Sequence, residues 1–304
     1  MQNKTLNGSL MVLGAAMLWG TTGTAQSLVP HQISAYWIGA LRLAVSAAFF
    51  AVFVFGTEPR SRWQQDLRRL AWPEVVLAGA CIAGYNLAFF AGVKANGVAI
   101  GTAIALGSGP IWAGVLQWLL TRHIPRPAWW LGTLLAVAGG TLMVLGGSAD
   151  HAITLHGTLL CLAAGLGYAA YTVLNQRLVR VASPATVTLG VFSSAALVAL
   201  PAARLLSGPL FASASDWLLV GYLGVVATGV SFLLFSHALR WLASATAVTL
   251  ALAEPLVAFS LAVLVLHEQT TPNAWIGLGL VLAGLACVVG AEIRDSKRPA
   301  SRSA

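Results

Sequence analysis

The chain has 304 residues, of which 58% are hydrophobic and only 9% are charged. Because about a quarter of the residues of soluble domains are charged, this composition excludes an ordinary soluble protein and predicts an integral membrane protein. The net charge of +8 does not indicate nucleic-acid binding. That function needs a solvated basic face with stacking aromatic side chains, and no stretch of this chain offers one.

Ten apolar stretches are each about 20 residues long, which is enough to cross the hydrocarbon core of a bilayer. The first stretch could also be read as a cleaved signal peptide that begins at Lys4. Its length and its Trp19-Gly20 pair favour a retained span. The sequence therefore predicts an all-α integral membrane fold with spans at roughly 9–29, 34–55, 74–93, 97–120, 128–147, 157–179, 185–206, 217–239, 244–266 and 274–292.

The basic residues are distributed unevenly over the loops between these spans. With the N-terminus in the cytoplasm, 14 of the 17 Lys and Arg lie on the cytoplasmic side, whereas Lys94 and Arg204 lie outside and Arg42 lies within a span. Short cytoplasmic loops carry an excess of Lys and Arg. This bias predicts a multi-pass protein of the cell (inner) membrane with cytoplasmic termini and a basic tail over 293–304. The longest loop is Gly56–Pro73.

The second half of the chain repeats the first. Shifting the numbering by 145 aligns 99–145 with 244–290 without a gap. Chance matches between Ala and Leu are common in so apolar a chain, but prolines, a tryptophan and glycines in register are not. The sequence predicts two five-span repeats, 9–147 and 157–292, and an odd number of spans inverts one repeat relative to the other. The diagnostic pairs are Pro110 and Pro255, Pro127 and Pro272, Trp130 and Trp275, Gly132 and Gly277, and Gly139 and Gly284.

Several elements of these repeats resemble a known family. The segment Leu18–Thr24 and Arg42 are similar to the start of an EamA-type repeat. A mid-helix proline, a polar turn with Glu and then Trp-x-Gly, as at Trp275 and Gly277, are similar to its end. The resemblance covers roughly 10–291. It implies a transporter of the drug/metabolite transporter superfamily, in the amino-acid/metabolite exporter group.

The polar turn differs between the two repeats. Where the family usually has an acidic residue, the first repeat has Arg122-His123, whereas the second has Glu268. Any role that the resemblance implies for this carboxylate therefore carries over to Glu268 alone.

Inverted repeats underlie many secondary transporters, which bind substrate near the bilayer midplane where the repeats meet. Pro110 and Pro255 would then be mirror-related helix breaks, because proline removes a backbone hydrogen bond. In lipid such a break is tolerated where neighbouring helices or water satisfy the freed carbonyl. Prolines without such a role are also common in membrane helices, but the pair in register favours hinges or cavity-forming breaks.

Several aromatic, polar and small residues lie deep within the predicted spans. Membrane aromatics often lie in the interfacial belt or pack between helices, and the tryptophans at the span ends fit that interpretation. The deeper residues have polar or small neighbours at helical spacing, which is typical of a cavity wall. The predicted substrate-binding residues are Trp19, Gly23, Tyr85, Asn86, Ser108, Trp112, Tyr168, Tyr171, Ser231, Phe235 and Glu254.

Three titratable or charged residues lie well inside predicted spans, namely Arg42, His237 and Glu254. Such groups are costly in a membrane and are therefore functional candidates. Arg42 lies near the outer end of its span and could instead extend to the interface. Arg42 and Glu254 also resemble scaffold positions of the family. A coupling role and a structural role stay open for Arg42 and His237, as do a substrate or proton role and a scaffold role for Glu254.

Motifs for catalysis or cofactor binding are missing. Cys81, Cys161 and Cys287 lie in separate apolar stretches without CxxC spacing, so we interpret them as small buried hydrophobes. The chain lacks the zinc-hydrolase, serine-hydrolase and ATP-binding P-loop motifs. We therefore expect no enzyme activity, no catalytic residue, no metal and no cofactor. Transport would be driven by a gradient, by exchange or by downhill release.

These observations predict a secondary transporter with a central, alternately accessible cavity. Its expected substrate is a small metabolite, an amino acid or a related amphipathic compound, and the family resemblance implies export. A proton-coupled exporter of aromatic or hydrophobic cations, which aromatic faces attract, is the main alternative. A membrane scaffold that transports nothing is a second one. A channel is disfavoured because no ring of like charges or filter sequence is visible.

The expected partners follow from this prediction. They are a small-molecule substrate, the lipid bilayer and, in the coupled alternative, protons, but no nucleic acid. A monomer is expected, with a homodimer left open.

Overall fold

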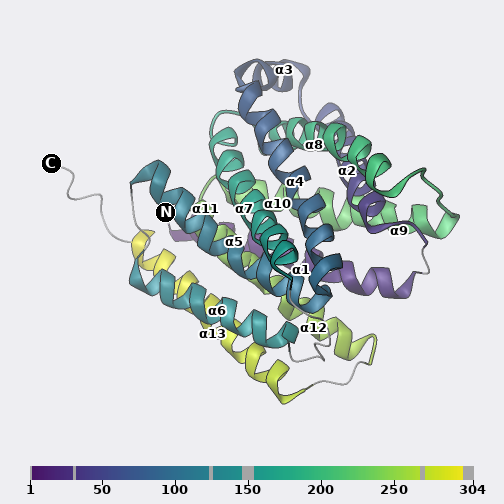
Figure 1. Ribbon diagram of the computed structural model, residues 1–304. Helices are drawn as coiled ribbons and strands as arrows, with labels where there is room; N and C mark the ends of the chain where they lie inside the picture. The colour runs from purple at the N-terminus through teal and green to yellow at the C-terminus, as the bar shows by residue number, and fades with distance from the viewer. Residues whose placement is uncertain (1, 30–31, 123–125, 146–153, 268–270, 297–304) are drawn as a thin grey trace.

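The computed structural model of this protein describes residues 2–29, 32–122, 126–145, 154–267 and 271–296 (Figure 1). All regular secondary structure in these ranges is helical, which confirms the predicted all-α fold. The first half contains α1 (Gln2–Leu28), α2 (Ala35–Thr57), α3 (Arg60–Arg69), α4 (Trp72–Asn96), α5 (Val98–Thr121) and α6 (Pro127–Leu145). The second half contains α7 (Leu155–Leu178), α8 (Pro184–Ser207), α9 (Ala214–Gly224), the π-helical turn η1 (Val225–Val230), α10 (Ser231–Ala238), α11 (Ser244–Leu250), the 3₁₀ turn η2 (Ala251–Ala253), α12 (Glu254–Leu264) and α13 (Pro272–Ser296).

Eight helical stretches in the described ranges are long and apolar enough to cross a membrane. A further apolar helix, Pro127–Met143, is shorter and corresponds to the predicted span 128–147. The remaining predicted span, 9–29, corresponds to α1, whose C-terminal half is rich in polar residues such as Thr22 and Gln26. Each predicted span thus has a helical counterpart in the described residues, and the chain is a multi-pass membrane protein.

One detail of the prediction was wrong. The predicted loop Gly56–Pro73 contains the helix α3, because this short polar segment is helical without being apolar enough for a span. The helix α13 continues into the predicted tail as far as Ser296, and the rest of the tail lies outside the described residues. The predicted spans 217–239 and 244–266 correspond to the apolar stretches Ala214–Ala238 and Ser244–Leu264, which are built as α9–η1–α10 and α11–η2–α12.

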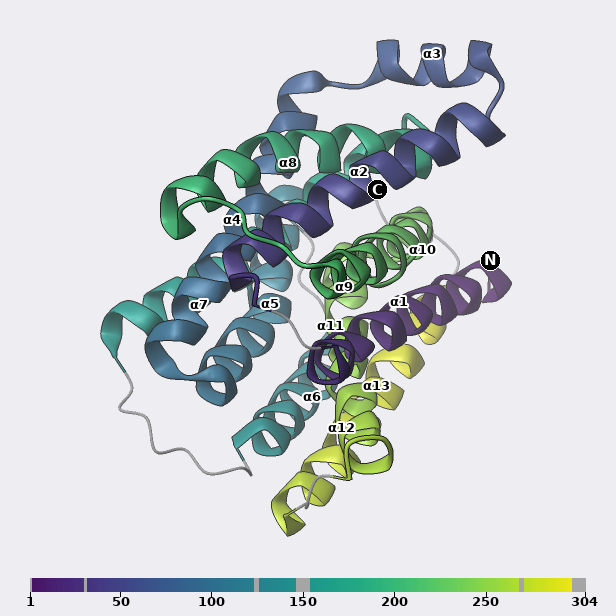
Figure 2. The same cartoon turned by 90° about the vertical axis from the view of Figure 1, so that its right-hand side faces the viewer.

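The helices pack as two inverted repeats. The helix α1 of the first repeat corresponds to α7 of the second. α4 and α5 pack against α7, and their counterparts α10 and α12 pack against α1. The corresponding helices α2 and α8 pack against each other, as do α6 and α13 (Figure 2). The main contacts between the repeats therefore have counterparts with the partners exchanged, and the two repeats interlock around an approximate two-fold axis.

The crossing of α6 and α13 demonstrates the inversion at single residues. A Cβ added at Gly139 would lie 2.6 Å from the carbonyl oxygen of Gly277. A Cβ added at Gly132 would lie 2.8 Å from the carbonyl oxygen of Gly284. The register-related glycines thus pair crosswise, as two antiparallel copies of one helix must. Small residues at such a crossing let the two backbones approach closely.

Two buried carboxylates join the repeats at opposite ends of the bundle. Asp216, in the first turn of α9, accepts hydrogen bonds from the backbone N–H groups of Gln32 (3.1 Å) and Ile33 (3.4 Å), just before α2. Asp66 on α3 accepts one from the backbone N–H of Ser183 (2.9 Å), the N-cap of α8. Each carboxylate therefore fixes the start of a long helix in the other repeat.

We expect Gly139→Ala to destabilise the protein by about 1–3 kcal/mol, the usual range for overpacking, because the added methyl group would collide with the backbone of α13. The Tm of the detergent-solubilised protein measures this loss. Gly140→Ala is the matched control, since a Cβ there would meet no atom of a neighbouring element within 4 Å. Equal melting temperatures for the two variants would contradict the close crossing.

Candidate binding cavity

A cavity of about 290 Å³ lies where the two repeats meet. The first repeat lines it with the C-terminal halves of α1 and α4 and the N-terminal halves of α2 and α5. The cavity is therefore displaced toward the end of the bundle at which α1 leads into α2. The second repeat contributes residues of α7, α10 and the broken span α11–η2–α12. The volume of the cavity is close to the lower end of the range for small-molecule pockets, about 300 Å³.

Pro255 explains why α11 and α12 do not form one regular helix. Proline has no N–H, so the carbonyl of Ala251 cannot accept the usual α-helical bond from residue 255. It accepts one from the N–H of Glu254 instead, and Ala251–Ala253 forms a 3₁₀ turn. Glu254 directly follows this break and lines the cavity. In the first repeat, α5 stays α-helical through Pro110, so the two register-related prolines lie in different conformations.

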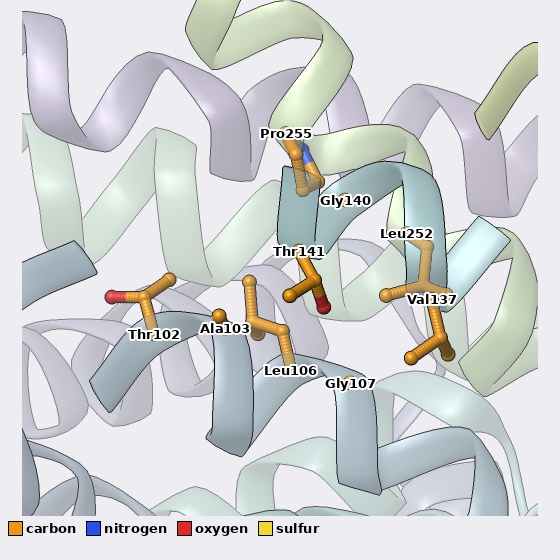
Figure 3. Close-up of a pocket in the computed structure, with 9 residues that line it drawn as sticks. All are labelled: Thr102, Ala103, Leu106, Gly107, Val137, Gly140, Thr141, Leu252 and Pro255. Carbon is orange, nitrogen blue, oxygen red and sulfur yellow. The ribbon is translucent and has the colours of Figure 1, made fainter. Parts of the chain in front are cut away.

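A small fissure lies beside this break (Figure 3). Its volume is about 10 Å³, which is close to the space needed for one water molecule, and it separates α5 and α6 from Pro255. Thr102, Leu106 and Leu252 line both the fissure and the main cavity. The helices are therefore not close-packed at the level of Pro255.

Arg42 and Glu254 bring opposite charges to this cavity, one from each repeat. Among the described residues, no ion pair joins them, and the buried Nε of Arg42 has no hydrogen-bond partner. The carboxylate of Glu254 likewise receives no hydrogen bond from a described residue. Unpaired charges within a membrane-embedded bundle are costly. A ligand that carries both counter-charges would remove that cost.

An aromatic layer bounds the cavity on the side away from the α1–α2 connection. The ring centroid of Trp19 lies 5.0 Å from that of Phe232 and 6.4 Å from that of Tyr168. Tyr171 and Phe235 are fully buried and pack behind these rings. Trp19 Nε1 and Tyr168 OH are buried without a partner among the described residues. This otherwise apolar wall therefore contains two unused polar groups, which are rare in folded proteins.

Many of the residues predicted from the sequence lie together in the cavity wall. They come from α1, α2, α4, α7 and the start of α12, segments that are far apart in the chain. Their role in binding stays a prediction. The wall contains Trp19, Gly23, Arg42, Tyr85, Asn86, Tyr168 and Glu254.

Other predicted binding residues lie outside the wall. Tyr171 and Phe235 lie behind the aromatic layer. The hydroxyl of Ser231 donates to the carbonyl of Ala227 at 2.7 Å, within its own helix. Ser108 and Trp112 lie further along α5; Ser108 packs against Gly165 of α7.

The remaining predicted positions are placed as follows. His237 lies outside the cavity, and its Nδ1 contacts the carbonyl oxygen of Leu233 at 2.8 Å. Pro110 is buried within α5, whereas Pro255 lines the fissure. Glu268 lies outside the described residues.

Phe232 lines the cavity, although the sequence analysis selected its neighbours Ser231 and Phe235. In a regular α-helix over the whole span 217–239, successive side chains would project at about 100° intervals. The turn Val225–Val230 is π-helical, and a π-turn contains more residues than an α-turn. It therefore rotates α10 relative to the expected projection. Sequence periodicity contains no signal for such a turn.

Two interlocked inverted repeats around a cavity with charged and aromatic walls have the architecture of a secondary transporter. The sequence pattern of the EamA-like transporter family matches residues 6–145 and 155–290. The chain belongs to this family, and the resemblance inferred from its motifs is confirmed.

Known proteins of this kind match nearly the whole chain. The uncharacterized transporter YwfM of Bacillus subtilis is 37% identical over 298 residues, which cover 95% of each chain. The threonine/homoserine exporter RhtA of Escherichia coli is 29% identical over 276 residues, or 90% of this chain and 88% of RhtA. A crystal structure with a TM-score of 0.80 and 22% identity covers 96% of this chain and 99% of its own, which supports the fold alone.

The aromatic layer generates a prediction for cysteine labelling. In a variant without the native cysteines, Tyr85→Cys should react with a small thiol reagent at least roughly tenfold faster than Tyr171→Cys. The reagent can reach position 171 only when the surrounding helices open locally. Tyr85 lines the cavity and Tyr171 is fully buried. Labelling rates in detergent, read by mass spectrometry, measure the difference. Equal rates would contradict a closed layer.

Proposed function

We propose that this chain exports an amino acid or a related amphipathic metabolite across the cell (inner) membrane by alternating access at the cavity. The observation that carries the proposal is the presence of Arg42 and Glu254 in one cavity, where no described residue forms a short ion pair or a hydrogen bond with either charged group. An α-amino acid has one carboxylate and one ammonium group. Hydrogen bonds between such charged groups and a guanidinium or a carboxylate are the strong ones.

The rest of the wall suits a small side chain. Tyr85, Phe89 and Phe90 provide apolar and aromatic surface. Trp19 Nε1 and Tyr168 OH are free to hydrogen-bond to a polar substituent such as a hydroxyl group. The similarity to a relative named as a threonine/homoserine exporter supports the same substrate class.

Alternating access is supported by the asymmetry of the repeats. The broken spans that contain η1 and η2 correspond to α4 and α5, which are regular α-helices in the first repeat. Exchange of the two conformations would close the present cavity and open one at the opposite end, as inverted repeats allow. With the N-terminus in the cytoplasm, the present cavity lies toward the outside. This is the side at which an exporter releases its substrate.

The charge pairing predicts which part of the substrate each residue recognises. Arg42→Gln should weaken transport of an amino acid much more than transport of the corresponding decarboxylated amine. Glu254→Gln should weaken transport of the amino acid much more than transport of the corresponding deaminated acid. Each loss should be about 10- to 150-fold, because a hydrogen bond to a charged group contributes about 1.5–3 kcal/mol. Counterflow into proteoliposomes that contain the purified protein measures the rates.

Matched controls separate recognition from a general effect of charge. Arg204→Gln and Glu74→Gln remove the same charges outside the cavity and should leave transport unchanged. Losses of equal size in the controls would contradict the assignment. Absence of saturable amino-acid transport by well-folded protein would overturn the proposed substrate class, and absence of any transport would favour the scaffold alternative.

A second candidate is a proton-coupled exporter of aromatic or hydrophobic cations. The aromatic wall favours it, since Trp19, Tyr85 and Tyr168 lie in the same cavity as Glu254, and aromatic faces attract cations. In this case an imposed pH gradient should drive cation movement, and Glu254→Gln should abolish it. Arg42→Gln should then preserve or raise cation transport, because it removes a repelling charge.

The break at Pro255 predicts a separate effect on turnover. Pro255→Ala restores an N–H that can donate to the carbonyl of Ala251, so α11 and α12 should join into one helix. A central proline costs about 3 kcal/mol relative to alanine, so the variant should favour one conformation and slow transport by at least about tenfold.

Thermal unfolding and initial transport rates are compared for this variant. The Tm of Pro255→Ala should be equal to or higher than that of the unmodified protein. Pro201→Ala, in the lipid-exposed part of α8, is the matched control and should transport normally. Normal transport by Pro255→Ala would contradict a hinge at this break.

A further inference from the structure

The helix α3 is held at the membrane surface by its connections. Two residues separate it from the end of α2, and two separate it from the start of α4. Both α2 and α4 are long and apolar enough to cross the membrane. Figures 1 and 2 display α3 as the outermost element at this end of the bundle. It therefore lies at the level where lipid headgroups surround the protein.

The exposed surface of α3 is strongly basic. Arg60, Arg62, Arg68 and Arg69 are exposed, and none forms an ion pair with a described residue. Asp66, on the same helix, is buried and accepts a hydrogen bond from Ser183. The carboxylate of Asp66 thus contacts the protein, whereas the four arginine side chains are exposed.

Aromatic side chains anchor this end of the bundle. The ring of Trp63 on α3 packs against Phe55 of α2, with 5.1 Å between ring centroids. Phe55 is itself 56% exposed, and Trp72 at the start of α4 is 47% exposed. Tryptophan side chains are enriched at the headgroup level of membranes. Arginines beside such anchors are typical of a surface that contacts lipid headgroups.

The basic surface includes both repeats. Arg62 and Arg69 lie four residues before and three residues after Asp66, and so share its side of α3. The hydrogen bond that Asp66 accepts from the backbone N–H of Ser183 brings that side against the turn between α7 and α8. Arg180, in this turn, is exposed and forms no ion pair with a described residue. Three arginines therefore flank one contact between the repeats.

No other carboxylate near this contact forms an ion pair with these arginines among the described residues. Glu58, just before α3, lies 3.5 Å from the hydroxyl of Thr186 and pairs with no described arginine. Glu74 lies in the first turn of α4. Guanidinium groups bind phosphate with two parallel hydrogen bonds, and an anionic lipid offers that group at this depth.

We propose that Arg62, Arg69 and Arg180 bind the phosphate group of an anionic phospholipid, and that the bound lipid bridges the two repeats. The site lies at the end of the bundle opposite the cavity, since α2 begins beside the cavity and ends beside α3. The bound lipid therefore stabilises the contact between α3 and the turn before α8. The proposal does not depend on the identity of the transported substrate.

The test measures binding of phosphatidylglycerol to the detergent-solubilised full chain. Native mass spectrometry counts the retained lipids, and thermal unfolding measures the gain in Tm, with phosphatidylcholine as the neutral comparison. We expect phosphatidylglycerol, but not phosphatidylcholine, to be retained and to raise the Tm. The triple variant Arg62→Gln, Arg69→Gln and Arg180→Gln should bind it about 100-fold more weakly, because each arginine near an anionic surface contributes about fivefold.

A matched triple variant distinguishes a site from general attraction. Arg122→Gln, Arg240→Gln and Arg294→Gln remove three exposed charges at the ends of other helices and should keep normal lipid binding. Equal weakening in both triple variants would overturn the site. Inorganic phosphate alone should not raise the Tm; a gain equal to that with phosphatidylglycerol would also overturn a lipid site. Loss of the Tm gain in the first triple variant alone, with its Tm in phosphatidylcholine unchanged, would support it.

Discussion

The bilayer imposes one constraint on this whole structure, namely that backbone N–H and C=O groups in its core find partners within the protein. Regular helices meet it at almost every position of the described residues. The departures are concentrated in the second repeat, at the π-helical Val225–Val230 and the 3₁₀ turn Ala251–Ala253. Both lie in spans that reach the cavity. The irregular backbone is therefore confined to places where neighbouring helices or the cavity surround it, and those are also the places where the site is formed.

The bilayer also determines how the cavity is built. Arg42 and Glu254 are expensive in an apolar bundle, and no described residue pairs with them. The surrounding aromatic residues exclude lipid and limit the cavity to about 290 Å³. Asp66 and Asp216, near the two ends of the bundle, differ from this pair. Their carboxylate oxygens accept hydrogen bonds from backbone N–H groups. Two of these carboxylates thus serve as structural links at the ends of the bundle, whereas that of Glu254 lines the cavity.

Much of this arrangement could be predicted from the sequence, because an apolar stretch long enough to cross a bilayer must form a helix there. The apolar stretches predicted the helices, and the register of two prolines, a tryptophan and two glycines predicted the repeats. Trp19, Arg42, Tyr85 and Glu254 could be placed near one another because the repeats imply a central cavity. Phe232 could not, since a π-turn changes which residues face inward without leaving a pattern in the sequence. The lateral helix α3 was missed because a search for apolar spans does not detect a short basic helix.

The crosswise contact of Gly132 with Gly284 and of Gly139 with Gly277 also bears on the origin of the chain. A five-helix ancestor with this pair of glycines would have buried them against a second copy of itself inserted upside down. One gene would then have had to place its product in both orientations. Fusion of two copies removes that requirement and lets the halves diverge. In this chain the halves do differ, since Gly109 stands at the position in register with Glu254.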